Sequence, residues 1–262
     1  MHRPVPRRSG RGLTRGIPAV LSVVSAFVIW EIYVRVSGIS PLMLPAPSRV
    51  LDQMVQNRVL LWNNTLPTLT ATFAGFALSL AVAFGLSIIL DFMPRVRHAL
   101  FPIFVVSQTL PLVAIAPLVV LWFGFDLSPK VLLVALVTFF PMLVALVDGY
   151  ASTDPEIEDL MGSMGATRGQ IFRAARFPSA MPYFFAGLRI SITYAVVAAI
   201  FAEYVGARAG LGIVILNAKN SFRPDIVLAA VVISSLLTLV LFAATALLQR
   251  TVLRWRDVEG HR

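Results

Sequence analysis

Long apolar stretches, each about as long as a lipid bilayer is thick, recur along the whole chain. A helix needs about 20 mostly apolar residues to cross the hydrocarbon core. Six stretches meet this requirement, at residues 17–36, 67–90, 99–123, 131–147, 183–205 and 226–248. The pattern predicts an all-α integral membrane protein with six transmembrane helices. Residues 17–248 would form the membrane domain, between a basic tail at 1–16 and a second tail at 249–262.

The composition supports the same class. Of the 262 residues, 58% are hydrophobic and only 13% are charged, whereas soluble domains are about half apolar and a quarter charged. The chain has no cysteine, which excludes disulfides, thiolate metal sites and cysteine nucleophiles. His2, His98 and His261 fall in the tails or between spans. We therefore predict neither a metal site nor catalysis within the membrane.

The first apolar stretch follows an arginine-rich start and has two interpretations. It could be the core of a cleavable signal peptide, which would need a small-residue cleavage site after it. Here the apolar core runs into Trp30-Glu31-Ile32-Tyr33 instead. We favour a retained membrane anchor.

The excess of basic residues predicts the orientation. Positive charge collects on the cytoplasmic side of membrane proteins. Fourteen Lys and Arg residues lie in the two tails and in the segments 91–98 and 148–182, against six in the segments on the other side. Both termini are therefore expected in the cytoplasm. Because the basic residues are spread over several segments without interleaved aromatics, we expect lipid rather than nucleic acid as their partner.

The longest segment on the cytoplasmic side, residues 149–182, has signals for its own helices. Asp154 and Pro155 are typical of a helix start, and Gly165 can adopt the left-handed conformation that ends a helix. A second helical stretch, 167–176, should end at Phe177-Pro178. The sequence predicts two short amphipathic helices joined at a glycine. The alternative is a solvated linker with no function of its own.

This segment resembles the coupling loop of the membrane subunits of ATP-binding-cassette (ABC) importers that work with an extracytoplasmic binding protein. Their signature is a Glu-Ala-Ala triplet, three residues, a glycine, nine residues, and an ending close to Ile-x-Leu-Pro. With Gly165 aligned, the triplet falls on Asp159-Leu160-Met161 and the ending on 175–178. The glycine, the proline and both spacings are kept. Asp replaces Glu, and larger residues replace the alanine pair.

Further motifs resemble those of one group of these permeases. Residues resembling the sulfonate/nitrate/taurine group lie at 44–47, 122–124, 139–141, 187–189 and 210–212. Within this group, one branch is similar at 107–111, 163–166 and 182–187. That branch is associated with pyrimidine precursors of thiamine and similar heteroaromatic nutrients.

The resemblance implies a fold, a location and partners. It implies the six-helix fold of type I ABC importer permeases, in the inner (cytoplasmic) membrane of a prokaryote. The partners would be two ABC ATPase subunits, a second permease copy and an extracytoplasmic binding protein. The chain has no Gly-x-x-x-x-Gly-Lys-Ser/Thr motif, so ATP would be bound and hydrolysed by a partner. The residues expected to couple to that partner are Asp159, Gly165, Ala166, Phe177 and Pro178.

The translocation pathway has separate candidates. In the third span, Pro111 removes a backbone donor just after Gln108 and Thr109. Polar groups beside a broken helix near the bilayer centre are typical of a transport site. A packing kink, with Gln108 bonded to a neighbouring helix, is the alternative. Pro141 is a similar, weaker case. Glu203 could line the outer gate, or pair with Arg208 or Lys219.

Two other charges near spans have structural interpretations. Arg189 would snorkel or bond to loop carbonyls, and Glu31 would reach the outer interface. The sequence shows no buried cluster of basic residues, which favours a neutral or weakly charged organic solute. An ion-coupled secondary transporter is the alternative function, and it would need an intramembrane acid and no ATPase. A membrane scaffold is a third possibility.

Overall fold

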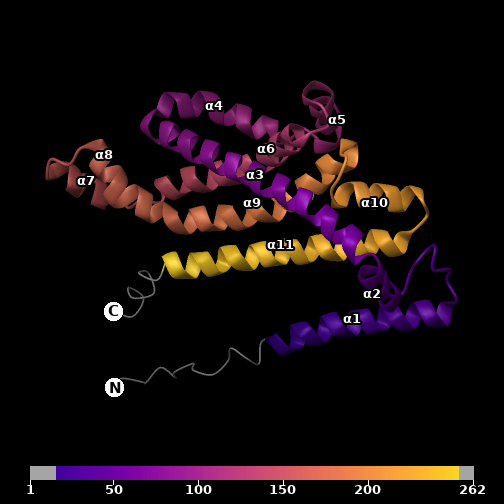
Figure 1. The fold of residues 1–262 in the computed structure, drawn as a ribbon. Helices are drawn as coiled ribbons and strands as arrows, with labels where there is room; N and C mark the ends of the chain where they lie inside the picture. Colours follow the sequence, from indigo (N-terminus) through magenta and orange to yellow (C-terminus); the bar gives the residue numbers. More distant parts are fainter. Residues whose placement is uncertain (1–15, 254–262) are drawn as a thin grey trace, which may run out of the picture.

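The computed structural model describes residues 16–253, and this part of the chain is helical throughout, without a strand (Figure 1). Its elements are α1 (Gly16–Ser37), α2 (Pro47–Gln56), α3 (Arg58–Phe92), α4 (Pro94–Ser107), α5 (Leu112–Phe123), α6 (Leu127–Ala151), α7 (Pro155–Ser163), α8 (Arg168–Ile171), the π turn η1 (Phe172–Arg176), α9 (Phe177–Gly206), α10 (Leu211–Asn220) and α11 (Pro224–Val252). Most of the two predicted tails, 1–16 and 249–262, lies outside the described residues.

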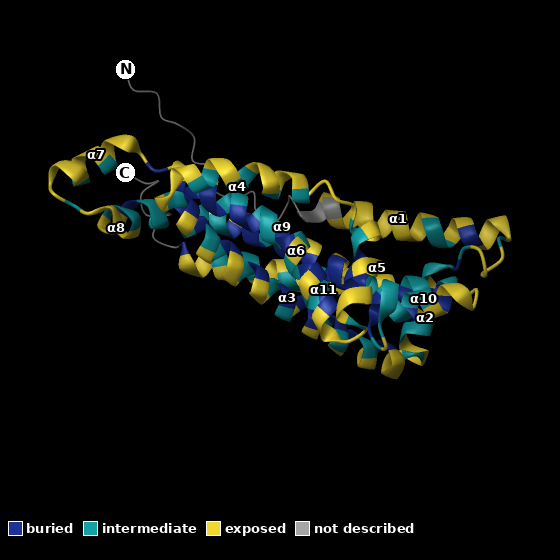
Figure 2. Cartoon of the chain, turned by 90° about the horizontal axis from the view of Figure 1, so that it is seen from above, coloured by how far each residue is buried: buried dark blue, intermediate teal, exposed yellow. Residues whose placement is uncertain are grey.

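The core of the bundle is formed by α3, α6 and α9, and the most extensive contact is between α6 and α9. Small residues let these helices approach closely. A Cβ added at Gly187 would lie 2.5 Å from the Cβ of Ala145, and one added at Gly75 would lie 2.5 Å from the Cβ of Val134. In a bilayer, close backbone packing of this kind takes the place of the hydrophobic effect between helices. The buried residues follow this seam, while the outer faces are exposed (Figure 2).

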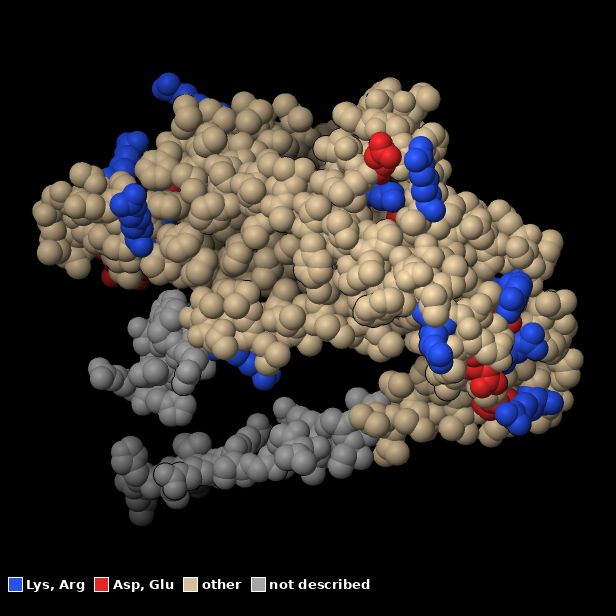
Figure 3. All heavy atoms as spheres, viewed as in Figure 1, with Lys and Arg blue, Asp and Glu red and all other residues tan. Residues whose placement is uncertain are grey.

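The described helices agree with a multi-pass membrane protein. Five of them are long and apolar enough to cross a bilayer, and α4 with α5 would make a sixth if this bent pair is one span. Charged side chains gather toward the two ends of the molecule, with a broad uncharged belt between them (Figure 3). Such a belt is what the hydrocarbon core requires.

The predicted span 99–123 is not one straight helix, and its break falls beside Pro111, where the sequence predicts a broken helix. The structure has two helices, α4 and α5, bent by 98° at a break over residues 108–111. Pro111 has no N–H to donate to the carbonyl of Ser107, so the helical ladder cannot continue there. The hydroxyls of Ser107 and Thr109 bond to the carbonyls of Phe104 and Val106, at 2.7 and 2.8 Å, and so stabilise the helix end.

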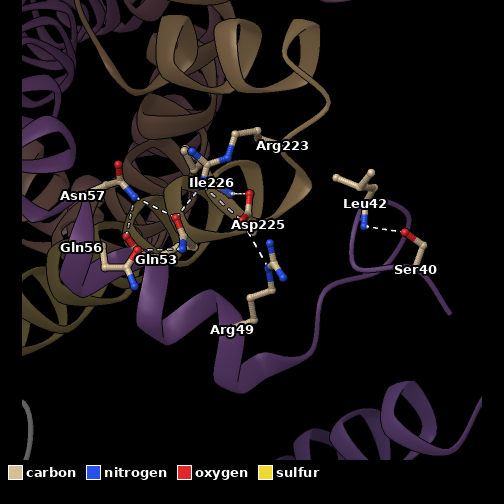
Figure 4. A network of polar contacts seen from close by, with 9 residues as sticks. All are labelled: Ser40, Leu42, Arg49, Gln53, Gln56, Asn57, Arg223, Asp225 and Ile226. Carbon is tan, nitrogen blue, oxygen red and sulfur yellow. Dashed lines mark hydrogen bonds and ion pairs between the residues drawn. The ribbon is translucent and has the colours of Figure 1, made fainter. Parts of the chain in front are cut away.

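At the end of the molecule that carries α2 and α10, polar contacts fasten the elements together. Arg49 of α2 and Arg223 both point to Asp225 in the first turn of α11, at 3.5 and 3.3 Å (Figure 4). Arg223 also donates to Gln53 of α2 at 2.6 Å. Glu31 of α1 accepts hydrogen bonds from the backbone and side chain of Ser48 in α2, at 2.9 and 2.8 Å. These bonds fix α1, α2 and α11 to each other.

Two further boundaries differ from the prediction. The second span begins at Arg58 rather than at 67, because polar residues between 57 and 66 continue the helix at the end of the bundle. The segment 206–225, between the last two predicted spans, contains α10, whose buried Leu211 and Val214 pack against α2, α3 and α11. Glycines are unfavourable inside a helix, but Gly210 and Gly212 lie at the start of this one.

Candidate functional site

The segment 149–182 has the predicted arrangement of helix, glycine and helix. The Asp154 side chain caps α7 by accepting a hydrogen bond of 3.0 Å from the backbone N–H of Glu156. The helix ends at Ser163, and Gly165, two residues later, has φ +83°. The Ala166 N–H closes the turn on the carbonyl of Met161 at 3.0 Å. The left-handed conformation at this position is why a glycine is required there.

The second helix also begins with a cap, because Thr167 and Gln170 form a capping box. The expectation that it ends at Phe177-Pro178 is wrong. The chain continues through η1 into α9, and the Phe177 N–H bonds to the carbonyl of Phe172, five residues back. A π turn is wider than an α turn, so it leaves room for the ring of Pro178 without ending the helix. The segment is therefore rigidly continuous with α9.

The predicted coupling residues lie in two different environments. Asp159 and Gly165 are exposed at the tip of the segment, and Ala166 is partly buried beside them. Phe177 and Pro178 lie within the helix that leads into the bundle. The Phe177 ring packs against those of Phe84 and Phe172. The first group could therefore contact a partner, and the second group could transmit a displacement.

Arg176 joins three elements at the base of this segment. Its Nε and Nη2 donate to the two carboxylate oxygens of Glu158 in α7, each at 2.7 Å. Its Nη1 lies 3.1 and 3.0 Å from the carboxylate oxygens of Asp91, near the end of α3. The hydrogen bonds from Arg176 hold the pKa of the Glu158 carboxyl below its usual range. This cluster fixes α7 to both α3 and α9.

In the sequence, Arg176 is only one of the basic residues that predict the orientation. A local pattern could not reveal its role, because Asp91 is 85 positions away in the chain. Beside the cluster lies a cavity of about 610 Å³, lined by His98 of α4, Tyr150 of α6 and the three charged side chains. The structure thus brings the segments 91–98 and 148–176 together at one end, which the count of basic residues placed on one side.

The break at 108–111 contains three of the predicted pathway residues. Gln108 caps the end of α4, Pro111 begins α5, and Gln108, Thr109 and Pro111 are exposed. The Thr109 hydroxyl is used by its own helix. The alternative in which Gln108 bonds to a neighbouring helix is not seen, since its side chain forms no hydrogen bond with any residue in 16–253. Pro141 lies inside α6, which continues through it unbroken.

Glu203 is fully buried and holds the start of α10 against α3. One carboxylate oxygen accepts hydrogen bonds from the Thr68 hydroxyl and the Gly212 N–H, both at 2.9 Å. The Glu203 carboxylate fills the space that a Cβ at position 210 would need, so only a glycine fits there. The predicted pairing of Glu203 with Arg208 or Lys219 is not formed. Lys219 donates to the Tyr204 hydroxyl instead, at 3.1 Å.

The contact that Arg189 makes also differs from the predicted one. Its guanidinium lies over the ring of Phe242 in α11, with the Cζ atom 5.8 Å from the ring centroid. Its Nε is buried and has no partner within residues 16–253. A cation over an aromatic face is a stabilising contact between α9 and α11. The structural interpretation of Arg189 holds, although the contact is with an aromatic ring rather than with loop carbonyls.

The sequence profile of the family described as "binding-protein-dependent transport system inner membrane component" matches residues 81–254, which include the segment around Gly165. The chain belongs to this family. It is thus the permease component of an ABC importer, and the comparison decides against the ion-coupled alternative. The permease is 37% identical to the formylaminopyrimidine transport permease protein ThiX of Halalkalibacterium halodurans, over 92% of this chain and 97% of that protein.

A second relative is the riboflavin transport system permease protein RibX of Chloroflexus aurantiacus, 36% identical over 92% of this chain and 90% of that protein. Taurine and aliphatic sulfonate permeases are also similar, which confirms both predicted branches. Among solved structures, the MetNI methionine ABC transporter in an inward-facing conformation matches 74% of this chain and 97% of its own, with a TM-score of 0.66 and 16% identity. That match confirms the all-helical fold of an ABC importer permease, and the described residues contain five or six spans.

Proposed function

We propose that the permease forms half of a translocation pathway for a small heteroaromatic solute. A second copy supplies the other half, and two ATPase subunits bind to the segments 149–182 of the two copies. A binding protein delivers the solute at the opposite end, next to α2 and α10. Both termini lie in the cytoplasm of a prokaryote. ATP is hydrolysed by the partner subunits.

The observation that carries this proposal is the exposed apolar surface on α7. Ile157, Leu160 and Met164 are 49%, 62% and 80% exposed on a helix capped by acids, next to the exposed Asp159. This helix lies outside the candidate spans, so the hydrocarbon core of the bilayer does not explain the exposure of those side chains. An amphipathic helix of this kind is suited to a groove in a partner protein.

The connections of α7 explain how a partner could move the bundle. Arg176 fastens α7 to α3, and the π turn η1 continues without interruption into α9. A displacement of α7 is therefore passed to two helices of the core at once. In this proposal Asp159 and Ala166 contact the ATPase, Gly165 sets the angle between the short helices, and Phe177 and Pro178 join the segment to the spans.

The solute class rests on the relatives and on the pathway candidates. Two of the relatives are named for a pyrimidine and for riboflavin, both of which contain nitrogen heteroaromatic rings. Gln108 and Thr109 are uncharged, which suits a neutral ring better than a sulfonate anion. A taurine-like solute is the second candidate, favoured by the similarity to taurine and sulfonate permeases.

The test is uptake by the purified complex in proteoliposomes. The permease is co-expressed with the ATPase and binding-protein genes that we expect beside it. Uptake of formylaminopyrimidine, riboflavin and taurine is then measured with and without ATP. We expect uptake of a heteroaromatic solute only when ATP and the ATPase are both present. Uptake by the permease alone would overturn the coupling, and uptake of taurine only would overturn the solute class.

A further inference from the structure

A small cavity lies beside the break between α4 and α5. Its volume is about 230 Å³, and its walls come from the break itself, from α5, from α6 and from α9. Gln108 and Tyr194 are its largest polar side chains, and Leu136 and Val137 of α6 form part of its apolar wall. Residues from separate helices, distant in sequence, therefore converge on one site.

The cavity lies near the middle of the spans. Leu136 and Val137 are near the centre of α6, which extends from Leu127 to Ala151. Tyr194 is likewise far from both ends of α9. At this depth a polar side chain must face protein or a water-filled space, because lipid offers no hydrogen bonds.

Two polar groups at this cavity are free to bind a solute. The hydroxyls of Ser107 and Thr109 bond to carbonyls of their own helix. The amide of Gln108 and the phenol of Tyr194 form no hydrogen bond with residues 16–253, and Tyr194 is 52% exposed. An amide that can donate and accept and an aromatic ring thus border the same apolar space.

We propose that this cavity is the permease's share of a solute site within the membrane, in which Tyr194 stacks on a planar nitrogen heterocycle and the Gln108 amide hydrogen-bonds to its edge. The inference rests on the proposed function and specifies where the solute is recognised. Stacking on an aromatic face does not depend on which heterocycle is bound. The amide can match a ring nitrogen as acceptor and an exocyclic amine as donor, without adding a charge.

The location can be tested without knowing the solute. Because the chain has no cysteine, a single introduced thiol reports on its position alone. We expect the Tyr194→Cys and Gln108→Cys variants to react with a charged, membrane-impermeant thiol reagent in the purified complex. Leu239→Cys, at a 62% exposed position in the middle of α11, is the matched control and should not react. Failure of both variants to react would overturn the site, whatever solute is transported.

Recognition is tested next, with formylaminopyrimidine as the probe. It should slow labelling of Tyr194→Cys when delivered by the binding protein. Tyr194→Ala should raise the KM for uptake about three- to tenfold, which corresponds to the loss of one aromatic contact, and Tyr194→Phe should restore it. Gln108→Leu should raise KM by a similar factor. Tyr33→Ala, which removes a comparably exposed tyrosine from α1, should leave KM unchanged.

The two hypotheses fail in different ways. If the wild-type complex takes up taurine but no heterocycle, the solute class is wrong, and the site is overturned with it. If the wild type takes up a heterocycle while Tyr194→Ala and Gln108→Leu transport it with unchanged KM, the proposed function stands and this site is overturned.

Discussion

Arg176 binds Glu158 through two parallel hydrogen bonds, Nε to Oε1 and Nη2 to Oε2, each 2.7 Å long. This fork geometry is specific to arginine, and it leaves Nη1 to bond with Asp91. One side chain therefore determines the position of α7 relative to α3 and to the start of α9. Because the partner is expected to bind α7, Arg176 should matter for both stability and coupling.

Replacing Arg176 tests this role. We expect Arg176→Ala to lower the free energy of unfolding by about 1–2 kcal/mol, since it leaves two partly buried carboxylates without a partner. Arg176→Lys should recover little, because an ammonium cannot form the paired bonds. Both variants should reduce stimulation of the ATPase by the binding protein. Arg173→Ala, at an exposed position of the same π turn, should behave as wild type in melting and ATPase measurements.

The same ion pair predicts a pH dependence. The pKa of Glu158 is lowered in the folded protein, so its contribution to stability is complete above the ordinary pKa of glutamate, about 4.3, and is lost as the pH falls below that value. Glu158→Gln should therefore lower the melting temperature at pH 7, and the difference from wild type should shrink below about pH 4. Glu156→Gln, on the same helix, should show no such convergence. A constant difference at all pH values would contradict this assignment.

Gly165 and Gly162 form a matched pair for testing the turn. Neither would place a Cβ near another atom, but only Gly165 has a positive φ, +83°. Gly165→Val should strain the turn by about 1–2 kcal/mol and abolish ATP-coupled uptake, while the protein still inserts into the membrane. Gly162→Val should leave uptake nearly intact. Membrane insertion and uptake are measured together, and equal effects of the two variants would contradict the role of the turn.

The buried contact between Glu203 and Gly210 predicts coupled mutations. Glu203→Gln should lower stability by about 1–3 kcal/mol, because it weakens the bonds from Thr68 and Gly212. Gly210→Ala should also be destabilising, since its Cβ would overlap the carboxylate. The double variant Glu203→Ala with Gly210→Ala should be more stable than the sum of the single losses predicts. Additive losses in thermal melting would show that the two residues act independently.

The orientation is open to direct labelling. Ser163→Cys and Ser221→Cys each place one thiol at an exposed position, at opposite ends of the molecule. In intact cells stripped of the outer layers, an impermeant reagent should label Ser221→Cys only. In inverted vesicles it should label Ser163→Cys only. The reverse pattern would place the α7 surface outside the cell and remove the basis for an ATPase partner there.

Local and compositional signals predicted much of this structure. The apolar stretches located the spans, and the Asp154 cap and Gly165 located α7 and its end, because both signals depend on neighbouring residues alone. Features that depend on contacts between residues distant in sequence could not be predicted. The Arg176–Asp91 contact and the burial of Glu203 under α10 depend on packing between distant segments. The π turn was not predicted either, because a Phe-Pro pair ordinarily marks a helix end. Here the wider turn accommodates the proline.

That π turn fixes the direction in which α7 points. A π turn holds one residue more than the surrounding α-helix, and each residue of an α-helix accounts for about 100° of rotation. Deleting one alanine from η1 would let this turn close as an ordinary α turn, whereas deleting one residue from the first regular turn of α9 would rotate the two short helices by about 100° around the axis of α9 and away from Asp91, with every predicted contact residue still present. The fit of the permease to its ATPase partner would then depend on the number of residues between α7 and α9 as much as on their identity.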